Sequence, residues 1–167
     1  SCWGRAEHGQ TSPPNRTWSM MDGGKFSTCG LDTSGSMSCW GLGQADETDP
    51  PGGDYESFGM GEASGCAIDT QGEIDCWGLV STLGSSPGGS FESVVCGKGH
   101  CCALDIDGAI DCWGNDAEGA TRPPNGGFKQ VSCGSLHCCG INLDGVPVCW
   151  GSNNDADGVR IGQATPP

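Results

Sequence analysis

Residues 91–114 read FESVVCGKGHCCALDIDGAIDCWG and contain three short apolar runs separated by glycine turns. Near-copies of this stretch recur along the chain. The Cys-Trp-Gly triplet that closes it begins at Cys2, Cys39, Cys76, Cys112 and Cys149, so the spacings are 37, 37, 36 and 37 residues. A fixed period of this size indicates one supersecondary unit that buries its apolar face only against further copies, which must stack or form a ring.

The local pattern within the quoted stretch is that of β-strands. Phe91–Val94 supplies strand-forming residues before a Cys-Gly pair, and two further runs flank a turn that ends in glycine. If Cys102 faces Cys112 on antiparallel strands, the hairpin loop consists of Ile106, Asp107 and Gly108. The last residue of such a loop is left-handed, which favours glycine. Gly35, Gly72 and Gly145 hold the same place in the other copies, so four copies predict one register.

The same register predicts disulfide bonds. Directly opposed residues on antiparallel strands have Cα atoms about 4.5–5.5 Å apart, within the range of disulfides. We therefore expect the pairs Cys29–Cys39, Cys66–Cys76, Cys102–Cys112 and Cys139–Cys149. A second set, Cys96–Cys101 and Cys133–Cys138, is indicated because both aligned positions lack cysteine in the first two copies. Cys2 remains unpaired or bonds to another molecule.

The pattern F-x-x-V-x-C-G-x-x-H-x-C-x-L-x-x-x-G-x-x-x-C-W-G, followed by a proline-containing loop, resembles the regulator of chromosome condensation repeat. Its cysteine-rich form is similar to the ectodomain repeats of crinkly-type plant receptor kinases. The residues that carry the resemblance are Val94, Gly97, His100, Ala103, Leu104, Gly108, Trp113 and Gly114, and again Val131, Gly134, His137, Gly145, Trp150 and Gly151. The first two copies depart from the pattern with Ser27 and Ser64 at the histidine position. The resemblance implies an all-β fold, a β-propeller or partial propeller of small antiparallel blades, commonly seven in the family.

On this basis we expect residues 1–167 to form a single repeat domain. It would contain a stray strand at 1–4, blades at about 18–41, 55–78, 91–114 and 128–151, and a C-terminal loop at 152–167. The stray strand lacks the first two strands of its blade. It therefore suggests a piece of a longer protein, or a protomer that completes its end blade with another molecule. The tryptophans of the five triplets are expected to pack between blades.

The composition favours an extracellular protein. Thirteen cysteines that pair almost completely indicate an oxidising compartment, and disulfides would supplement a thin apolar core in a chain with 31 glycines. Asn15-Arg16-Thr17 is an N-glycosylation sequon beside a Pro-Pro turn, so Asn15 is a candidate glycan site. The sequence contains no apolar run long enough to predict a membrane-spanning segment. A net charge of −14 argues against nucleic acid as a partner, because binding to phosphates needs a basic surface.

Two groups of residues could hold a metal ion. Asn153, Asp155 and Asp157 match the alternating start of a calcium loop, but Ala164 stands where the loop needs glutamate, so a solvated acidic turn is the favoured reading. Zinc at His100 with Cys96, Cys101 and Cys102 is disfavoured, because the cysteines have disulfide partners and the histidine is expected to bond to the backbone of a neighbouring blade. No cofactor is expected.

Two functions remain open. No nucleophile–base pair, paired catalytic carboxylates or phosphate-binding loop stands apart from the repeat, so we expect no enzyme. The first hypothesis is a secreted structural module of a fibre, appendage or matrix that assembles through its ends. The alternative is a ligand-binding or inhibitor propeller that recognises a protein or glycan through its loop face. Solution mass separates the two, and the irregular N-terminal strand and Cys2 favour assembly.

Overall fold

The structure, a computed structural model, describes residues 2–154, 158–160 and 162–165. Its strands form four antiparallel sheets of three strands each, which we call blades 1 to 4. The fold is all-β. The strands are β1 (Trp18–Gly23), β2 (Ser27–Asp32) and β3 (Met37–Gly41) in blade 1; β4 (Tyr55–Met60), β5 (Ser64–Asp69) and β6 (Ile74–Gly78) in blade 2; β7 (Phe91–Cys96), β8 (His100–Asp105) and β9 (Ile110–Gly114) in blade 3; and β10 (Phe128–Cys133), β11 (His137–Asn142) and β12 (Pro147–Gly151) in blade 4.

The expected hairpin register is confirmed in every blade. In blade 3, Cys102 lies opposite Cys112 and Leu104 lies opposite Ile110, and Gly108 ends the turn with a φ of 88°. An aspartate that precedes the turn also stabilises it. Asp105 Oδ1 accepts hydrogen bonds from the N–H groups of Asp107 and Ala109, at 2.9 and 2.8 Å. Such a side chain supports the turn by replacing a backbone acceptor.

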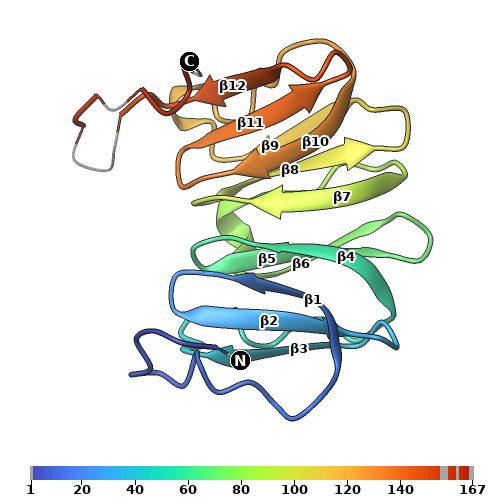
Figure 1. Ribbon diagram of the computed structural model, residues 1–167, viewed down its shortest axis with the longest axis vertical. Coiled ribbons are helices and arrows are strands. Elements are labelled where there is room, and N and C mark those ends of the chain that lie inside the picture. Colours follow the sequence, from blue (N-terminus) through green and yellow to red (C-terminus); the bar gives the residue numbers. More distant parts are fainter. Residues whose placement is uncertain (1, 155–157, 161, 166–167) are drawn as a thin grey trace.

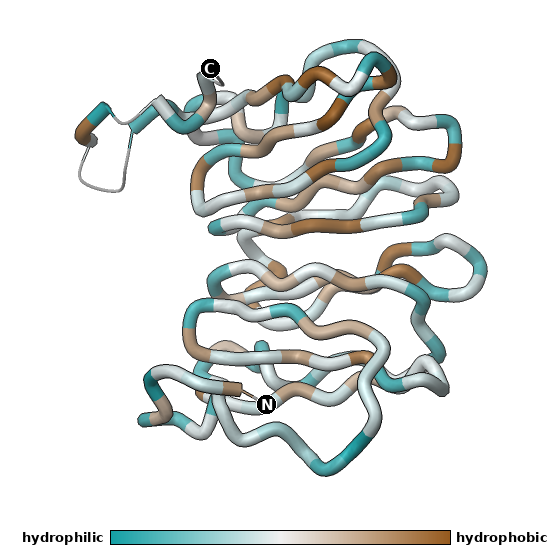
Figure 2. Tube along the Cα trace, in the orientation of Figure 1, coloured by the Kyte–Doolittle hydropathy of each residue, from teal (hydrophilic) through white to brown (hydrophobic). Residues whose placement is uncertain are grey.

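The four blades lie one after another in chain order along the long axis of the molecule (Figure 1). Each gap between blades is filled by an apolar cluster. Between blades 3 and 4, for example, Leu104 and Ile110 of blade 3 pack against Phe128, Val131 and Trp150 of blade 4. Hydrophobic stretches accordingly recur along the strands, while hydrophilic stretches are frequent in the connections (Figure 2). The core is therefore divided into layers between blades.

The tryptophans of the blades also hold the connections. Trp40, Trp77 and Trp150 are buried, and each indole Nε1 donates to the backbone carbonyl thirty residues earlier: Gln10 at 2.9 Å, Glu47 at 3.0 Å and Ala120 at 3.0 Å. Each bond ties the chain that enters a blade to the last strand of that blade. Trp113 is equally buried, but its Nε1 has no hydrogen-bond partner in the part of the chain that the structure describes. Two short 3₁₀ helices, η1 (Val80–Thr82) and η2 (Ala117–Gly119), lie in the connections.

The N-terminal segment differs from the expectation. Residues 2–4 form no strand, and Trp3 is 88% exposed instead of packing between blades. A strand needs a neighbour for its backbone hydrogen bonds, and residues 2–4 have no neighbouring strand among the residues that the structure describes. The expectation of an inter-blade core position thus fails for Trp3 and holds for Trp77, Trp113 and Trp150. Trp40 is buried too, but it packs against Trp18 of its own blade.

Candidate functional site

A groove of about 490 Å³ runs along one edge of the stack of blades, which we call the inner edge. It is formed where the first strand of each blade turns into the second, so each blade contributes one tight turn. The residues that line it are Gly23, Gly24, Lys25, Met60, Gly61, Glu62, Cys96, Gly97, Lys98, Cys133, Gly134 and Ser135. Because the contributing positions repeat, the groove is a property of the fold, whereas its chemistry depends on the residue that follows each turn glycine.

Glycine is required at these turns because the blades approach each other closely there. A Cβ on Gly97 would lie 2.3 Å from the carbonyl oxygen of Gly134 in the next blade. The close approach allows backbone hydrogen bonds between blades. The N–H of Glu62 donates to the carbonyl of Gly97 at 3.3 Å, and the N–H of Lys98 donates to that of Ser135 at 2.9 Å. The inner edge is thus held by main-chain contacts that only glycine permits.

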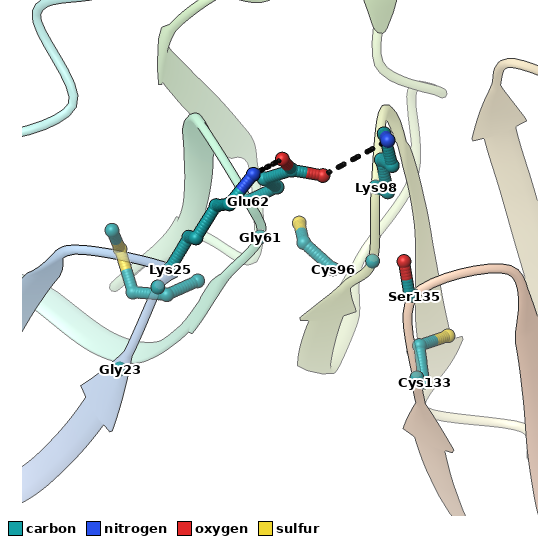
Figure 3. A pocket seen from close by; sticks show the side chains of 12 residues that line it. Gly23, Lys25, Gly61, Glu62, Cys96, Lys98, Cys133 and Ser135 are labelled. Carbon is teal, nitrogen blue, oxygen red and sulfur yellow. Dashed lines mark hydrogen bonds and ion pairs between the residues drawn. The ribbon is translucent and has the colours of Figure 1, made fainter. Parts of the chain in front are cut away.

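The rim of the groove carries an ion-pair network across three blades. The carboxylate of Glu62 in blade 2 lies between the ammonium groups of Lys25 in blade 1 and Lys98 in blade 3, pairing directly with the first and at 3.5 Å with the second (Figure 3). The hydrogen bond from Lys25, followed by the charge of Lys98, lowers the pKa of Glu62. Two ammonium groups therefore share one carboxylate, which leaves an excess positive charge on the groove of an acidic protein.

The structure brings twelve cysteines together in six pairs. Four pairs join the second and third strands of a blade: Cys29–Cys39, Cys66–Cys76, Cys102–Cys112 and Cys139–Cys149. Two pairs join the first and second strands: Cys96–Cys101 and Cys133–Cys138. Every disulfide therefore lies within one blade. Cys96 and Cys133 line the groove, so the second set lies next to the ion-pair network (Figure 3).

Disulfides of neighbouring blades touch. The Sγ atoms of Cys66 and Cys101 are 3.6 Å apart, and those of Cys102 and Cys138 are 3.5 Å apart. His100 completes the second contact, because its Nε2 lies 3.3 Å from Sγ of Cys138. The histidine thus meets a sulfur of the next blade, and not its backbone as the sequence suggested. Burial of the imidazole, before any other cause, lowers the pKa of His100.

The zinc ligands that the sequence suggested fall into two different groups in the structure. His100 is grouped with Cys133 and Cys138, and Cys96 is grouped with Cys66 and Cys101. All five cysteines are in disulfides, and it is the thiolate that binds a metal ion. In this oxidised state the described residues thus have no free thiolate for the zinc set.

The remaining candidate residues lie away from the groove. Asn153 uses its side-chain oxygen to accept hydrogen bonds from the N–H of Ala164 and the hydroxyl of Thr165, at 3.0 and 2.9 Å. The other two calcium candidates, Asp155 and Asp157, lie outside the described residues. Asn15 is exposed beside the Pro-Pro turn, and Cys2 is partly buried with no disulfide partner among the described residues.

Two features of the groove were missed at the level of sequence. The positions Lys25, Glu62, Lys98 and Ser135 share one phase of the repeat, so alignment of the copies could have placed them on one rim. The sulfur contacts were missed because they join residues of different blades that alignment puts at different phases.

Comparisons with known proteins agree with this architecture. Residues 91–120 and 128–156 match the regulator of chromosome condensation (RCC1) repeat family, which confirms the resemblance seen in the sequence. No curated protein sequence matches the chain. No helix in the part of the chain that the structure describes is long and apolar enough to cross a membrane.

Solved structures share the fold. The entire ectodomain of the Physcomitrella patens receptor kinase CR4 is 28% identical, with a TM-score of 0.74 over 86% of this chain and 42% of that one. The crinkly ectodomain of the Arabidopsis thaliana receptor kinase ACR4 is 25% identical, with a TM-score of 0.68 over 89% and 53%. Yeast RCC1 (Prp20), solved with Kap60, is 16% identical, with a TM-score of 0.71 over 85% and 45%, and shows the fold alone. The chain therefore spans about half the length of these relatives.

Proposed function

We propose that this chain of RCC1-type repeats is a non-enzymatic, secreted structural module that assembles through the end faces of its outer blades. The disulfide-rich fold and the likeness to receptor-kinase ectodomains support an extracellular propeller. The assembly role rests on one observation, which is that blade 4 presents a face of the same kind as those buried inside the stack.

The faces inside the stack follow one rule. The aromatic residue that begins each blade donates its N–H to the carbonyl of the turn glycine in the preceding blade: Tyr55 to Gly35 at 2.9 Å, Phe91 to Gly72 at 3.1 Å and Phe128 to Gly108 at 2.7 Å. Next to this bond, the second strand of the preceding blade offers a cysteine and an aliphatic residue to the new blade. In blade 3 these are Cys102 and Leu104, which are 0% and 1% exposed.

Blade 4 repeats this face, and among the described residues nothing covers it in the way that blade 4 covers blade 3. Cys139 and Ile141, which correspond to Cys102 and Leu104, are only partly buried. Outside its own chain neighbours, no atom lies within 4 Å of the Cβ position of Gly145, whereas the backbone of Phe128 lies 3.0 Å from that of Gly108. Among the described residues, the buried Nδ1 of His137 also has no hydrogen-bond partner.

Blade 1 offers the complementary face. Trp18 holds the position of Tyr55, Phe91 and Phe128, and Met21 beside it is 41% exposed. A blade of the same kind that docks head to tail would therefore find the donor and apolar surface that every inner interface uses. The two outer faces lie at opposite ends of the stack (Figure 1), so such contacts would continue it in both directions.

A second function is favoured by the groove. Its excess positive charge suits an acidic loop of a protein partner, and binding there would make the chain a ligand-binding module. The exposed sequon at Asn15 would carry a glycan in a secreted protein, and we place no nucleic acid or membrane among the partners. Yeast Prp20 is described with Kap60, Gsp1p and histones; for this chain, the proposed partner is a protein that presents a blade-like face.

Solution mass tests the assembly. We expect the purified chain to associate in a concentration-dependent manner in analytical ultracentrifugation, and Ile141→Asp to weaken the association at least about tenfold, because it places a charge in an apolar interface. Ile106→Asp is the matched control, since Ile106 is 69% exposed on a hairpin tip. A monomer at all concentrations, or equal effects of the two variants, would refute assembly through this face.

A further inference from the structure

One disulfide differs from the other five in its surroundings. Cys133 lines the groove and is partly exposed, while Cys138 is fully buried. The Sγ atom of Cys138 lies 3.5 Å from the Sγ atom of Cys102 and 3.3 Å from Nε2 of His100, both in blade 3. One sulfur of this disulfide can therefore be reached from the groove, and the other contacts both a second disulfide and an imidazole.

We propose that Cys133–Cys138 is an exchange-active disulfide that reacts with a thiol entering the groove, after which Cys138 forms a new disulfide with Cys102. The reactant is a small thiol or a cysteine of a partner protein. The product joins blades 3 and 4 covalently. This proposal is independent of the assembly through the end faces, because the groove and the end faces use different residues.

The first step is thiol–disulfide exchange at the exposed sulfur. The external thiolate attacks Sγ of Cys133, a new disulfide forms between them, and the Cys133–Cys138 bond breaks. The electron pair of that bond remains on Cys138 as a thiolate. Two lysines lie on the same groove, and Lys98 is 54% exposed, so the attacking thiolate meets positive charge on its approach.

The second step moves the bond inward. The Cys138 thiolate attacks Sγ of Cys102, the disulfide Cys102–Cys138 forms, and the Cys102–Cys112 bond breaks with its electron pair on Cys112. The thiolate of Cys112 takes up the proton that the external thiol lost. One thiol is consumed and one is formed, so no net oxidation or reduction occurs. The two reacting sulfurs are already in van der Waals contact in the folded state.

His100 is positioned to accept the proton of the Cys138 thiol. The imidazole is 1% exposed and hydrogen-bonds to the backbone at Lys98, which fixes its orientation toward the sulfur. Whenever Cys138 is present as a thiol, Nε2 can take its proton and restore the attacking thiolate, as in other cysteine–histidine pairs. We therefore assign His100 as the group that keeps Cys138 reactive.

The chain contains its own controls. Cys96–Cys101 touches Cys66 in the same manner, at 3.6 Å, but blade 2 has Ser64 at the position of His100. Cys29–Cys39 has no such neighbour, because blade 2 has Met60 and Gly65 at the positions of Cys96 and Cys101. Reactivity should therefore fall in the order Cys133–Cys138, Cys96–Cys101, Cys29–Cys39.

Mass spectrometry of the native chain exposed to reduced glutathione tests the proposal. Samples are quenched with acid, alkylated and digested without reduction, with electron-transfer fragmentation to assign neighbouring cysteines. We expect glutathione on Cys133, a linked peptide containing Cys102 and Cys138, and alkylated Cys112. Cys2 should be alkylated from the start and reports complete labelling. Glutathione on Cys133 without the linked peptide, or equal opening of all disulfides, would overturn the relay.

Two variants test the histidine. His100→Gln should slow formation of the Cys102–Cys138 bond by roughly 100-fold, the lower end of what a positioned acid or base contributes, and should leave the exchange of Cys96–Cys101 unchanged. Ser64→His should make the exchange of Cys96–Cys101 with Cys66 faster. If near-ultraviolet circular dichroism shows that His100→Gln does not fold, Ser64→His decides the question. Unchanged rates in the folded variants would overturn the role of His100.

Discussion

Replacing Gly97 with alanine should destabilise the stack at its inner edge. The added Cβ would lie 2.3 Å from the Gly134 carbonyl and 2.4 Å from Cε1 of His100, both much closer than van der Waals contact. Neither neighbour can withdraw easily, since one is backbone and the other is a buried ring. Overpacking of this kind costs about 1–3 kcal/mol. Loss of the hydrogen bond from Glu62 to the Gly97 carbonyl adds about 1 kcal/mol.

The expected loss in the free energy of unfolding is therefore about 2–4 kcal/mol, measured by urea denaturation with tryptophan fluorescence and intact disulfides. For a chain of this size, each kcal/mol corresponds to about 2–4 °C in Tm. Gly52→Ala is the matched control, because Gly52 has open space around its Cβ position and needs no left-handed backbone. If the two variants unfold within about 0.5 kcal/mol of each other, the inner glycines do not hold the blades as described.

Three further outcomes follow from individual side chains. Trp77→Phe should cost about 1–2 kcal/mol more than Trp113→Phe in the same denaturation assay, because the indole of Trp77 donates a hydrogen bond and that of Trp113 does not. Equal losses would contradict the role of that bond. Glu62→Gln should lower stability at neutral pH by up to about 1 kcal/mol, as expected for an ion pair at the surface. Because Lys25 lowers the pKa of Glu62, this contribution is present above the unfolded pKa of about 4.3 and is lost as the pH falls, so the wild type and the variant should converge in acid. Burial lowers the pKa of His100, so the unfolded state binds more protons and stability should decline as the pH falls below about 6.5; His100→Gln should flatten that part of the profile of Tm against pH.

The repeat made most of the single-blade structure predictable. Opposing Cys102 to Cys112 fixed the hairpin, and the glycine that ends its turn is left-handed as that register requires. Both results depend only on residues close together in the sequence, and four copies repeated the test. The bond from Asp105 to its own turn was equally accessible, since an acidic or amide side chain recurs before each turn.

Contacts between blades were harder to predict because they depend on how far each blade is rotated relative to the next. Sequence alignment places His100 and His137 at the same phase, but it does not show that His100 reaches the sulfur of Cys138. The exposed Trp3 shows that a match to the repeat does not by itself predict burial. Its triplet matches the repeat in full, and yet the side chain is not packed, because burial requires strands that these residues do not include.

The placement of the disulfides has a mechanical consequence. Each one closes a loop within a blade, so the covalent path from one blade to the next is the main chain alone. Under tension at its two ends, the chain would unfold one blade at a time. In blades 1 and 2, the disulfide would keep about ten residues of each repeat from extending. Each step in blades 1 and 2 would then release about 90 Å of extended chain. Blades 3 and 4 would release less, because the second disulfide of each holds back further residues. An array of such blades would lengthen in limited increments, set by the number of disulfides in each blade, and would keep a folded-back hairpin at every step.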